Sequence, residues 1–191
     1  MKNVLSTAAA LGASAAFSVV LLAQGTAVKP APQTTKPAAG STLPASSATF
    51  VKSAAEGGEA EVELATTAES KASNSEVKSL AATIHRDHET ANAELKTLAE
   101  KKNVTLPMAV SRTHQATANR LNKLSGAAFD KAYVNEMVKD HRADIATFQK
   151  HKTDADPDVA AFVAKTLPAL QNHLTMALNA QKAVGGSGGK N

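Results

Sequence analysis

A regular alternation of apolar positions between residues 75 and 102 is the clearest structural signal in the chain. The positions on one face follow at spacings of four and three: Val77, Ala81, Ile84, His88, Ala91, Leu95 and Leu98. This heptad-like spacing places all of them on the same side of an α-helix. Asn74 or Ser75 can cap its start, because short polar side chains accept hydrogen bonds from the first free amides of a helix. The pattern therefore predicts a helix packed along one face.

Other segments show the same helical period. A helix is expected over 47–71, with Ser46 or Ser47 as its cap and a Gly57-Gly58 pair inside it. The remaining expected helices cover 108–124, 127–152 and 157–183. The last of these has a good start signal in Asp156-Pro157, because Asp caps a helix and Pro suits its first position.

Two of these helices open with related sequences, which indicates an internal repeat. Residues 74–81 resemble 156–163, and residues 50–54 resemble 129–133. The helices would then form two related hairpins joined through the segment 108–124. Paired hairpins with one longer connection are the layout of ferritin-like bundles. We therefore expect an all-α protein, a ferritin-like four-helix bundle with an extra short connecting helix.

Both ends of the chain have compositions that do not suit a packed core. Residues 1–27 carry a lysine at position 2, continue through an apolar stretch and end in small residues, as a cleaved signal peptide does. A retained membrane anchor is the alternative, although Ala, Ser and Gly make the stretch weakly hydrophobic. Residues 28–46 predict a disordered linker rich in Pro, Ala and Thr, and 185–191 a disordered Gly-rich tail. The bundle is expected over 47–184, in the periplasm or otherwise exported, with no transmembrane segment after cleavage.

Composition removes several classes of function. The sequence has no cysteine, which excludes disulfides, thiolate metal sites and cysteine nucleophiles. Aromatic residues make up 3% of the chain, and its formal net charge is +4, with lysines interspersed among acidic residues. Solvated helix faces explain this charge better than a nucleic-acid surface does, and few rings are present to stack on bases. We therefore expect no nucleic-acid partner.

Histidines occupy positions of the predicted core, and this feature bears most directly on function. His88, His141 and His173 each lie on the apolar face of a different helix. Glu61 falls within the apolar arc of the helix expected over 47–71. When these faces pack together, a carboxylate and three imidazoles can meet at the centre of the bundle. Such nitrogen and oxygen ligands suit one divalent transition metal ion, such as Zn, Fe or Cu.

Further acidic residues are candidates for supporting roles at this site. Asp87 and Asp140 directly precede His88 and His141. Adjacent residues of a helix point about 100° apart, so these carboxylates suit the orientation of the rings better than binding of the ion. Glu63 belongs to a stripe of glutamates on the same helix and is a further candidate for this supporting role. A solvent-exposed helix flank explains that stripe better.

A metal-free explanation of the histidines stands beside the metal site. Buried histidines often bond only to a carbonyl or a carboxylate, and Asp–His pairs between helices can fix their register. The chain would then be a structural or interaction module of the cell envelope. The sequence contains no G-x-S-x-G, H-E-x-x-H or phosphate-binding glycine motif, so an enzyme is not favoured.

Several strings of residues resemble a family of exported bacterial proteins. They are Phe50-Val51-Lys52, Ala55-Glu56-Gly57-Gly58, Asp87-His88, Phe129-Asp130-Lys131-Ala132-Tyr133, Met137-Val138-Lys139-Asp140-His141 and Ala164-Lys165-Thr166-Leu167-Pro168. Over nearly all of 49–180, the chain resembles proteins that hold domain of unknown function 4142. The resemblance implies a ferritin-like helical bundle, often labelled an outer-membrane or periplasmic protein, whose function is not established.

One departure from the di-iron proteins of ferritin-like fold limits the expected chemistry. Those proteins use Glu-x-x-His on two of their helices, whereas this sequence contains no Glu-x-x-His. We therefore expect an exported metal-binding or envelope-stress protein without classical di-iron activity. Its expected partners are an envelope protein or a second copy of the chain.

Overall fold

The computed structural model describes residues 40–186 of the 191-residue chain. The expected signal peptide, residues 28–39 of the expected linker and residues 187–191 lie outside this described part. Within it the structure is all-α, which confirms the predicted fold class. Its helices are α1 (Ala45–Lys71), α2 (Ser75–Lys101), α3 (Arg112–Asn122), α4 (Gly126–Lys150) and α5 (Pro157–Gly186). In this part of the chain, no helix is both long and apolar enough to cross a membrane.

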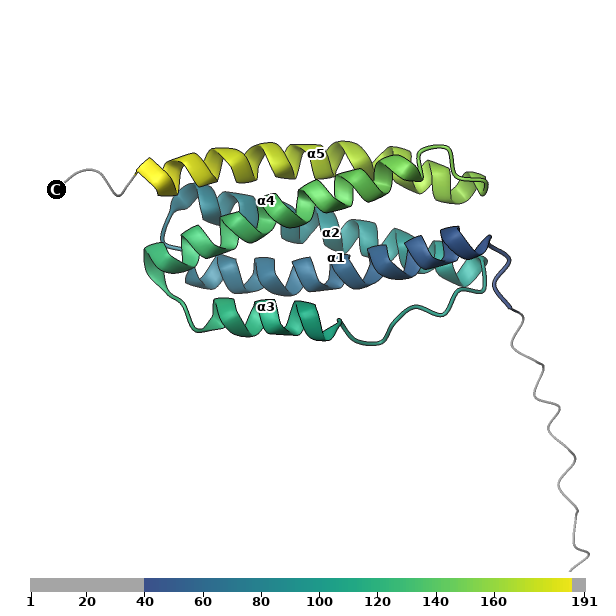
Figure 1. The fold of residues 1–191 in the computed structure, drawn as a ribbon, viewed down its shortest axis with the longest axis horizontal. Helices are drawn as coiled ribbons and strands as arrows, with labels where there is room; N and C mark the ends of the chain where they lie inside the picture. The colour runs from purple at the N-terminus through teal and green to yellow at the C-terminus, as the bar shows by residue number, and fades with distance from the viewer. Residues whose placement is uncertain (1–39, 187–191) are drawn as a thin grey trace, which may run out of the picture. The chain divides into compact units, whose positions relative to one another are not determined.

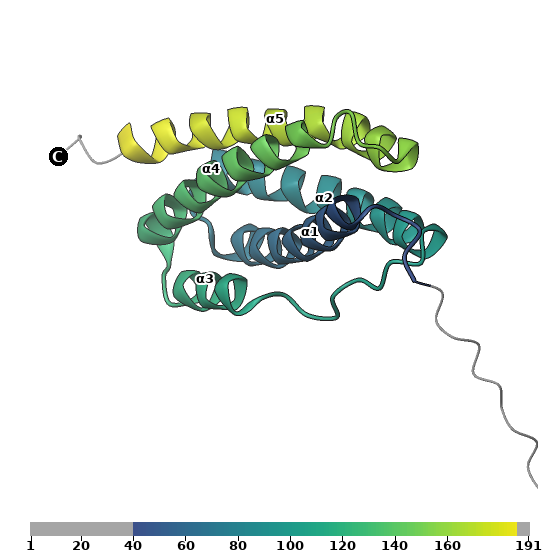
Figure 2. The same cartoon turned by 45° about the vertical axis from the view of Figure 1, so that its right-hand side comes forward.

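Two helical hairpins form the bundle, as the sequence predicts. Figure 1 shows α1 beside α2 and α4 beside α5, and the hairpins meet chiefly where α2 packs on α5. Seen from the second angle in Figure 2, α3 lies along the outer side of α1, away from α5. The short helix therefore covers the bundle without entering it.

Polar caps explain where the hairpin helices turn. The Asn74 side chain accepts hydrogen bonds from the amides of Glu76 (2.8 Å) and Val77 (3.3 Å), as predicted for the start of α2. Asp156 does the same for α5, accepting from the amides of Asp158 at 3.0 Å and Val159 at 3.2 Å. Each cap satisfies amides that the first turn of a helix leaves free. The expected starts of these two helices are therefore confirmed.

The start of α1 and the start of α3 differ from the sequence prediction. Neither Ser46 nor Ser47 caps α1, which begins at Ala45 after Pro44; the Ser47 hydroxyl instead donates to Asp154 Oδ1 at 2.7 Å. The residues before α1 are also packed, because Leu43 is buried. The linker expected over residues 28–46 therefore ends too late, because α1 already begins at Ala45. Helix α3 begins at Arg112, four residues later than expected, because the Ser111 side chain caps it.

Buried apolar side chains form two separate clusters along the bundle. One cluster lies at one end of the bundle and includes Leu64, Leu80 and Tyr133. The other cluster lies at the opposite end and includes Val51, Leu95 and Val163. Between these residues along α1, α2, α4 and α5 lie Glu61, His88, His141 and His173, all of them buried. The bundle thus has a polar layer sandwiched between two apolar ones.

Candidate metal centre

The helical spacing seen in the sequence brings the predicted histidines together. His88, His141 and His173 each offer a ring nitrogen, and these three nitrogens all lie within 4.8 Å of one another. The rings are almost completely shielded, with exposed fractions of 6%, 0% and 1%. In a bundle core, side chains that occupy seam positions at the same level on different helices meet near the axis. The three imidazoles accordingly form one cluster.

Two of these nitrogens, on His141 and His173, lie within hydrogen-bond distance of each other. Nε2 of His141 lies 3.1 Å from Nδ1 of His173. The other nitrogen of each ring faces an acceptor: His141 Nδ1 lies 3.0 Å from the Met137 carbonyl oxygen, and His173 Nε2 lies 3.0 Å from Asp87 Oδ2. A carbonyl and a carboxylate only accept hydrogen bonds, so these two nitrogens carry the protons of the neutral rings.

Two lone pairs therefore face each other across the 3.1 Å gap between the rings. Neutral rings in these tautomers repel at that distance unless a proton lies between them or both nitrogens bind one cation beside the gap. A tetrahedral ion with metal–nitrogen bonds of about 2.0 Å separates its nitrogen ligands by about 3.3 Å. The observed spacing is close to this value. The pair is consequently arranged as two ligands of one ion would be.

Glu61 faces the same cluster from α1. Its Oε2 lies 3.1 Å from Nε2 of His88, and its Oε1 lies 3.3 Å from Nδ1 of His141. These are ion-pair distances, but their alignment is not that of a hydrogen bond. Glu61 Oε1 and His88 Nε2 are accordingly buried without a hydrogen-bond partner in the described structure. Buried polar atoms normally have hydrogen-bond partners. A cation bound to these two atoms would take the place of the missing partners.

Burial sets the protonation of the cluster. It lowers the pKa of His88 to about 4, and it also lowers the pKa of His141 and His173. The rings are therefore neutral at physiological pH, which is the form that binds metal ions. Burial raises the pKa of Glu61 to about 7, against the attraction of His141. A cation in the cluster would favour the ionised carboxylate.

The supporting acidic residues do not act as the sequence suggested. Asp87 does not orient the neighbouring His88; it reaches α5 and bonds to His173, because α2 packs directly on α5. Asp140 contacts Lys139 at 3.6 Å, whereas His141 is oriented by its own helix through Met137. Glu63 is exposed and lies outside the cluster.

Sequence reasoning missed Asp144. This residue of α4 lies three positions after His141 and lines a cavity of about 30 Å³ together with Glu61 and His88. Its pKa is raised to about 8 by burial, by Glu61 and by Asp140. The spacing from His141 was a usable signal, because residues three apart share a helix face.

The comparisons with known proteins agree with the fold. Residues 32–180 match the sequence model of the family described as "Domain of unknown function (DUF4142)". The chain belongs to this family. No curated protein matches this DUF4142 chain.

Solved structures of the same fold include a DUF305 fragment from Deinococcus radiodurans, with 13% identity and a TM-score of 0.65 over 75% of this chain and 97% of that one. CopM in a Cu(II)-bound form has 20% identity and a TM-score of 0.61, over 72% of this chain and 96% of CopM. CopM in an Ag-bound form has 19% identity, a TM-score of 0.60 and the same coverage. Identities this low show that the DUF4142 chain shares the fold of these proteins.

Proposed function

We propose that this DUF4142 protein binds one transition metal ion through His88, His141 and His173, with Glu61 completing the site. The observation that carries the proposal is the buried pair of ring nitrogens on His141 and His173, 3.1 Å apart, whose partner nitrogens each face an acceptor. Stable folds rarely leave such atoms facing each other without a bridging charge. The apolar layers on both sides would exclude water and strengthen the interaction of the ion with its ligands.

The donor set limits which ions fit. Three imidazole nitrogens and one carboxylate oxygen suit Zn²⁺, Cu²⁺ or Fe²⁺, and three histidines with one open position recur at zinc sites. CopM, which shares the fold, is described in Cu(II)-bound and Ag-bound forms, and this supports including copper among the ions tested. Glu61 is the one carboxylate in the proposed ligand set, and this does not suit a di-iron centre, which needs several.

We further propose that the protein works in the cell envelope, in metal handling or in protection from stress, without catalytic turnover. The expected signal peptide over residues 1–27 supports an exported location. The site itself supports storage or transfer, because its histidines and Glu61 are shielded from any large substrate. Fractionation of cells that produce the full chain would test the location, and recovery in the cytoplasm alone would contradict it.

The chain offers a matched test of the metal site, since three of its six histidines lie in the cluster and three lie outside it. The purified chain is freed of metal with a chelator and titrated calorimetrically with Zn²⁺, Cu²⁺ and Fe²⁺. The His88/His141/His173→Ala variant is expected to lose binding. The control variant His85/His114/His151→Ala is expected to bind one ion as the wild type does. Circular dichroism establishes that both variants remain helical.

If the cluster variant does not fold, single substitutions replace it. His173→Leu keeps a bulky side chain on α5 but offers no ligand atom in place of the imidazole Nδ1, and it is expected to weaken binding at least tenfold. Wild-type protein that binds no ion would instead identify a metal-free polar network. In that case removal of one buried partner should cost about 1–3 kcal/mol of unfolding free energy.

A further inference from the structure

The cavity beside the metal centre runs from solvent-accessible residues to buried ligands. Its lining includes Ser53, which is exposed, and Gly57 and Asp144, which are half-buried. The same cavity is lined by the buried Glu61 and His88. Its volume of about 30 Å³ is close to the share of one water molecule in the liquid. An ion without most of its hydration shell would fit this space.

Two carboxyl groups that accept no hydrogen bond in the described part of the chain line this cavity. Asp144 makes no hydrogen bond or ion pair in the described part of the chain, and its charge interacts with that of Glu61. The Glu61 side chain is only 6% exposed, and its Oε1 has no hydrogen bond. Both groups are therefore available to a cation, one near the surface and the other beside the histidines.

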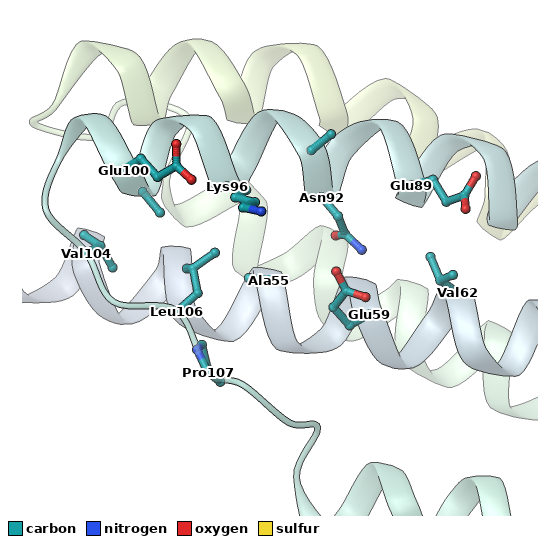
Figure 3. A pocket seen from close by; sticks show the side chains of 12 residues that line it. Ala55, Glu59, Val62, Glu89, Asn92, Lys96, Glu100, Val104, Leu106 and Pro107 are labelled. Atoms are coloured by element: carbon teal, nitrogen blue, oxygen red, sulfur yellow. The ribbon is translucent and has the colours of Figure 1, made fainter. Parts of the chain in front are cut away.

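The packing decides where the cavity opens. Toward α2, a Cβ atom on Gly58 would lie 2.1 Å from Asn92 Oδ1, so Asn92 closes the space against α1. A pocket of about 610 Å³ lies outside this contact, where Figure 3 shows Asn92 reaching toward α1, and Asn92 is the one residue that lines both spaces. Toward the outer face of α2 and α5, Phe162 closes the cavity with an exposed fraction of 7%.

Between α1 and α4, Phe148 closes the cavity on the side of Phe50, whose ring centroid lies 5.0 Å away, but not beside Gly57. A Cβ atom on Gly57 would meet no other atom within 4 Å, so open space adjoins this glycine. Asp144 lines the cavity from α4. The glycine thus leaves room for passage, and the carboxyl group of Asp144 lies on the same cavity, where an approaching cation favours its ionised form.

We propose that metal ions reach the centre between α1 and α4, past Gly57, and that Asp144 binds the ion before Glu61 and the histidines do. The inference rests on the proposed metal binding and adds its entry route. A carboxyl group at the mouth of a narrow passage ionises as a cation approaches and replaces part of the hydration shell as the ion enters. The site can then be both deeply buried and accessible.

Rates of metal transfer test this route on the full chain. Because the chain has no Trp, a coloured chelator in a stopped-flow instrument follows Zn²⁺ entering and leaving the protein. Gly57→Leu, which fills the open space, should lower the association and dissociation rates together by about tenfold and leave Kd within about threefold. Asp144→Asn should lower the association rate by about tenfold, because the amide cannot ionise and bind the entering cation as a carboxylate does.

Two control variants make the result specific. Ala93→Leu adds a bulky side chain to the exposed pocket between α1 and α2, and Glu63→Gln removes an exposed charge from α1 away from the cavity. Both should bind Zn²⁺ at the wild-type rate. Slower entry in Ala93→Leu, or wild-type rates in Gly57→Leu and Asp144→Asn, would overturn the route while leaving the site intact. Loss of equilibrium binding in Asp144→Asn would make it a permanent ligand and overturn its entry role. Wild-type protein that binds no Zn²⁺, Cu²⁺ or Fe²⁺ would instead refute the metal centre itself.

Discussion

Asp87 on α2 bonds to His173 on α5 at 3.0 Å and fixes which nitrogen of that ring carries the proton. This contact leaves His173 Nδ1 free to face His141. It also joins the two hairpins, because α2 belongs to one and α5 to the other. One carboxylate at the edge of the site therefore prepares a ligand and holds the helices that position it.

Asp87→Asn should weaken metal binding about 10- to 100-fold, the usual effect of losing a carboxylate that orients a histidine ligand. The amide can present its NH₂ group to the ring and favour the wrong tautomer. Competition with a chelator of known affinity measures the change. Asp140→Asn is the matched control, because Asp140 also precedes a histidine but contacts Lys139. Equal losses in both variants would show that general negative charge, not the contact to His173, supports binding.

Glu61→Gln should stabilise the metal-free protein at pH 8 while weakening metal binding. Burial raises the pKa of Glu61 from 4.5 to about 7, so ionisation is disfavoured in the folded state. The folded state binds the proton more tightly than the unfolded chain, so this group lowers stability as pH rises between those values. Urea unfolding with a chelator should show a gain on the order of 1–3 kcal/mol at pH 8.

The same comparison at pH 5 gives the control for Glu61→Gln. The gain should shrink there, because Glu61 is already protonated in the folded wild type. The site histidines have lowered pKa values, so their contribution falls as pH drops below 6.5. That contribution is common to both proteins to first order and largely cancels in the difference. A gain that is equal at both pH values would contradict the assignment of the raised pKa to Glu61.

Gly57 and Gly58 should respond in opposite ways to substitution by alanine. At Gly57 nothing blocks a Cβ atom, so Gly57→Ala should raise the unfolding free energy by about 0.5–1 kcal/mol through helix propensity. At Gly58 the new Cβ would lie 2.1 Å from Asn92 Oδ1 and force that side chain to move. Gly58→Ala should lower stability by about 1 kcal/mol or more. Recovery in the Gly58→Ala/Asn92→Ala double variant, measured by urea unfolding, would identify the clash as the cause.

Tyr133→Phe should be tolerated although Tyr133 is completely buried. Its hydroxyl has no hydrogen-bond partner in the described structure. Removing an unpaired buried hydroxyl leaves the packing of the ring intact, so thermal unfolding should show a change between zero and a gain of about 1 kcal/mol. A clear loss of stability would mean that the hydroxyl bonds to an internal water molecule.

The sequence predicted the helices and the meeting of the histidines because both depend on spacing along one chain. His88 continues the series of Val77, Ala81 and Ile84, so its burial follows from theirs. The partner of Asp87 depends instead on which helix packs beside α2, and spacing carries no information about that neighbour. For the same reason the start of α1 was misplaced, since Ser47 bonds to Asp154 across the bundle.

Asp144 shows a second limit of sequence reasoning. A charged residue three positions after a core histidine is ordinarily assigned to the surface, because burial of an unpaired charge is costly. The structure places it at a cavity that also contains Glu61 and His88. Only the position of α1 relative to α4 reveals that this face is partly enclosed.

The polar layer draws on both hairpins, with Glu61 and His88 from the first and His141 and His173 from the second. An ion bound there would cross-link the two hairpins. Binding of the ion would strengthen the contact between the hairpins, and its release would weaken that contact. A partner that separates the hairpins would therefore release the ion. The metal-bound protein would also resist proteases better than the metal-free protein.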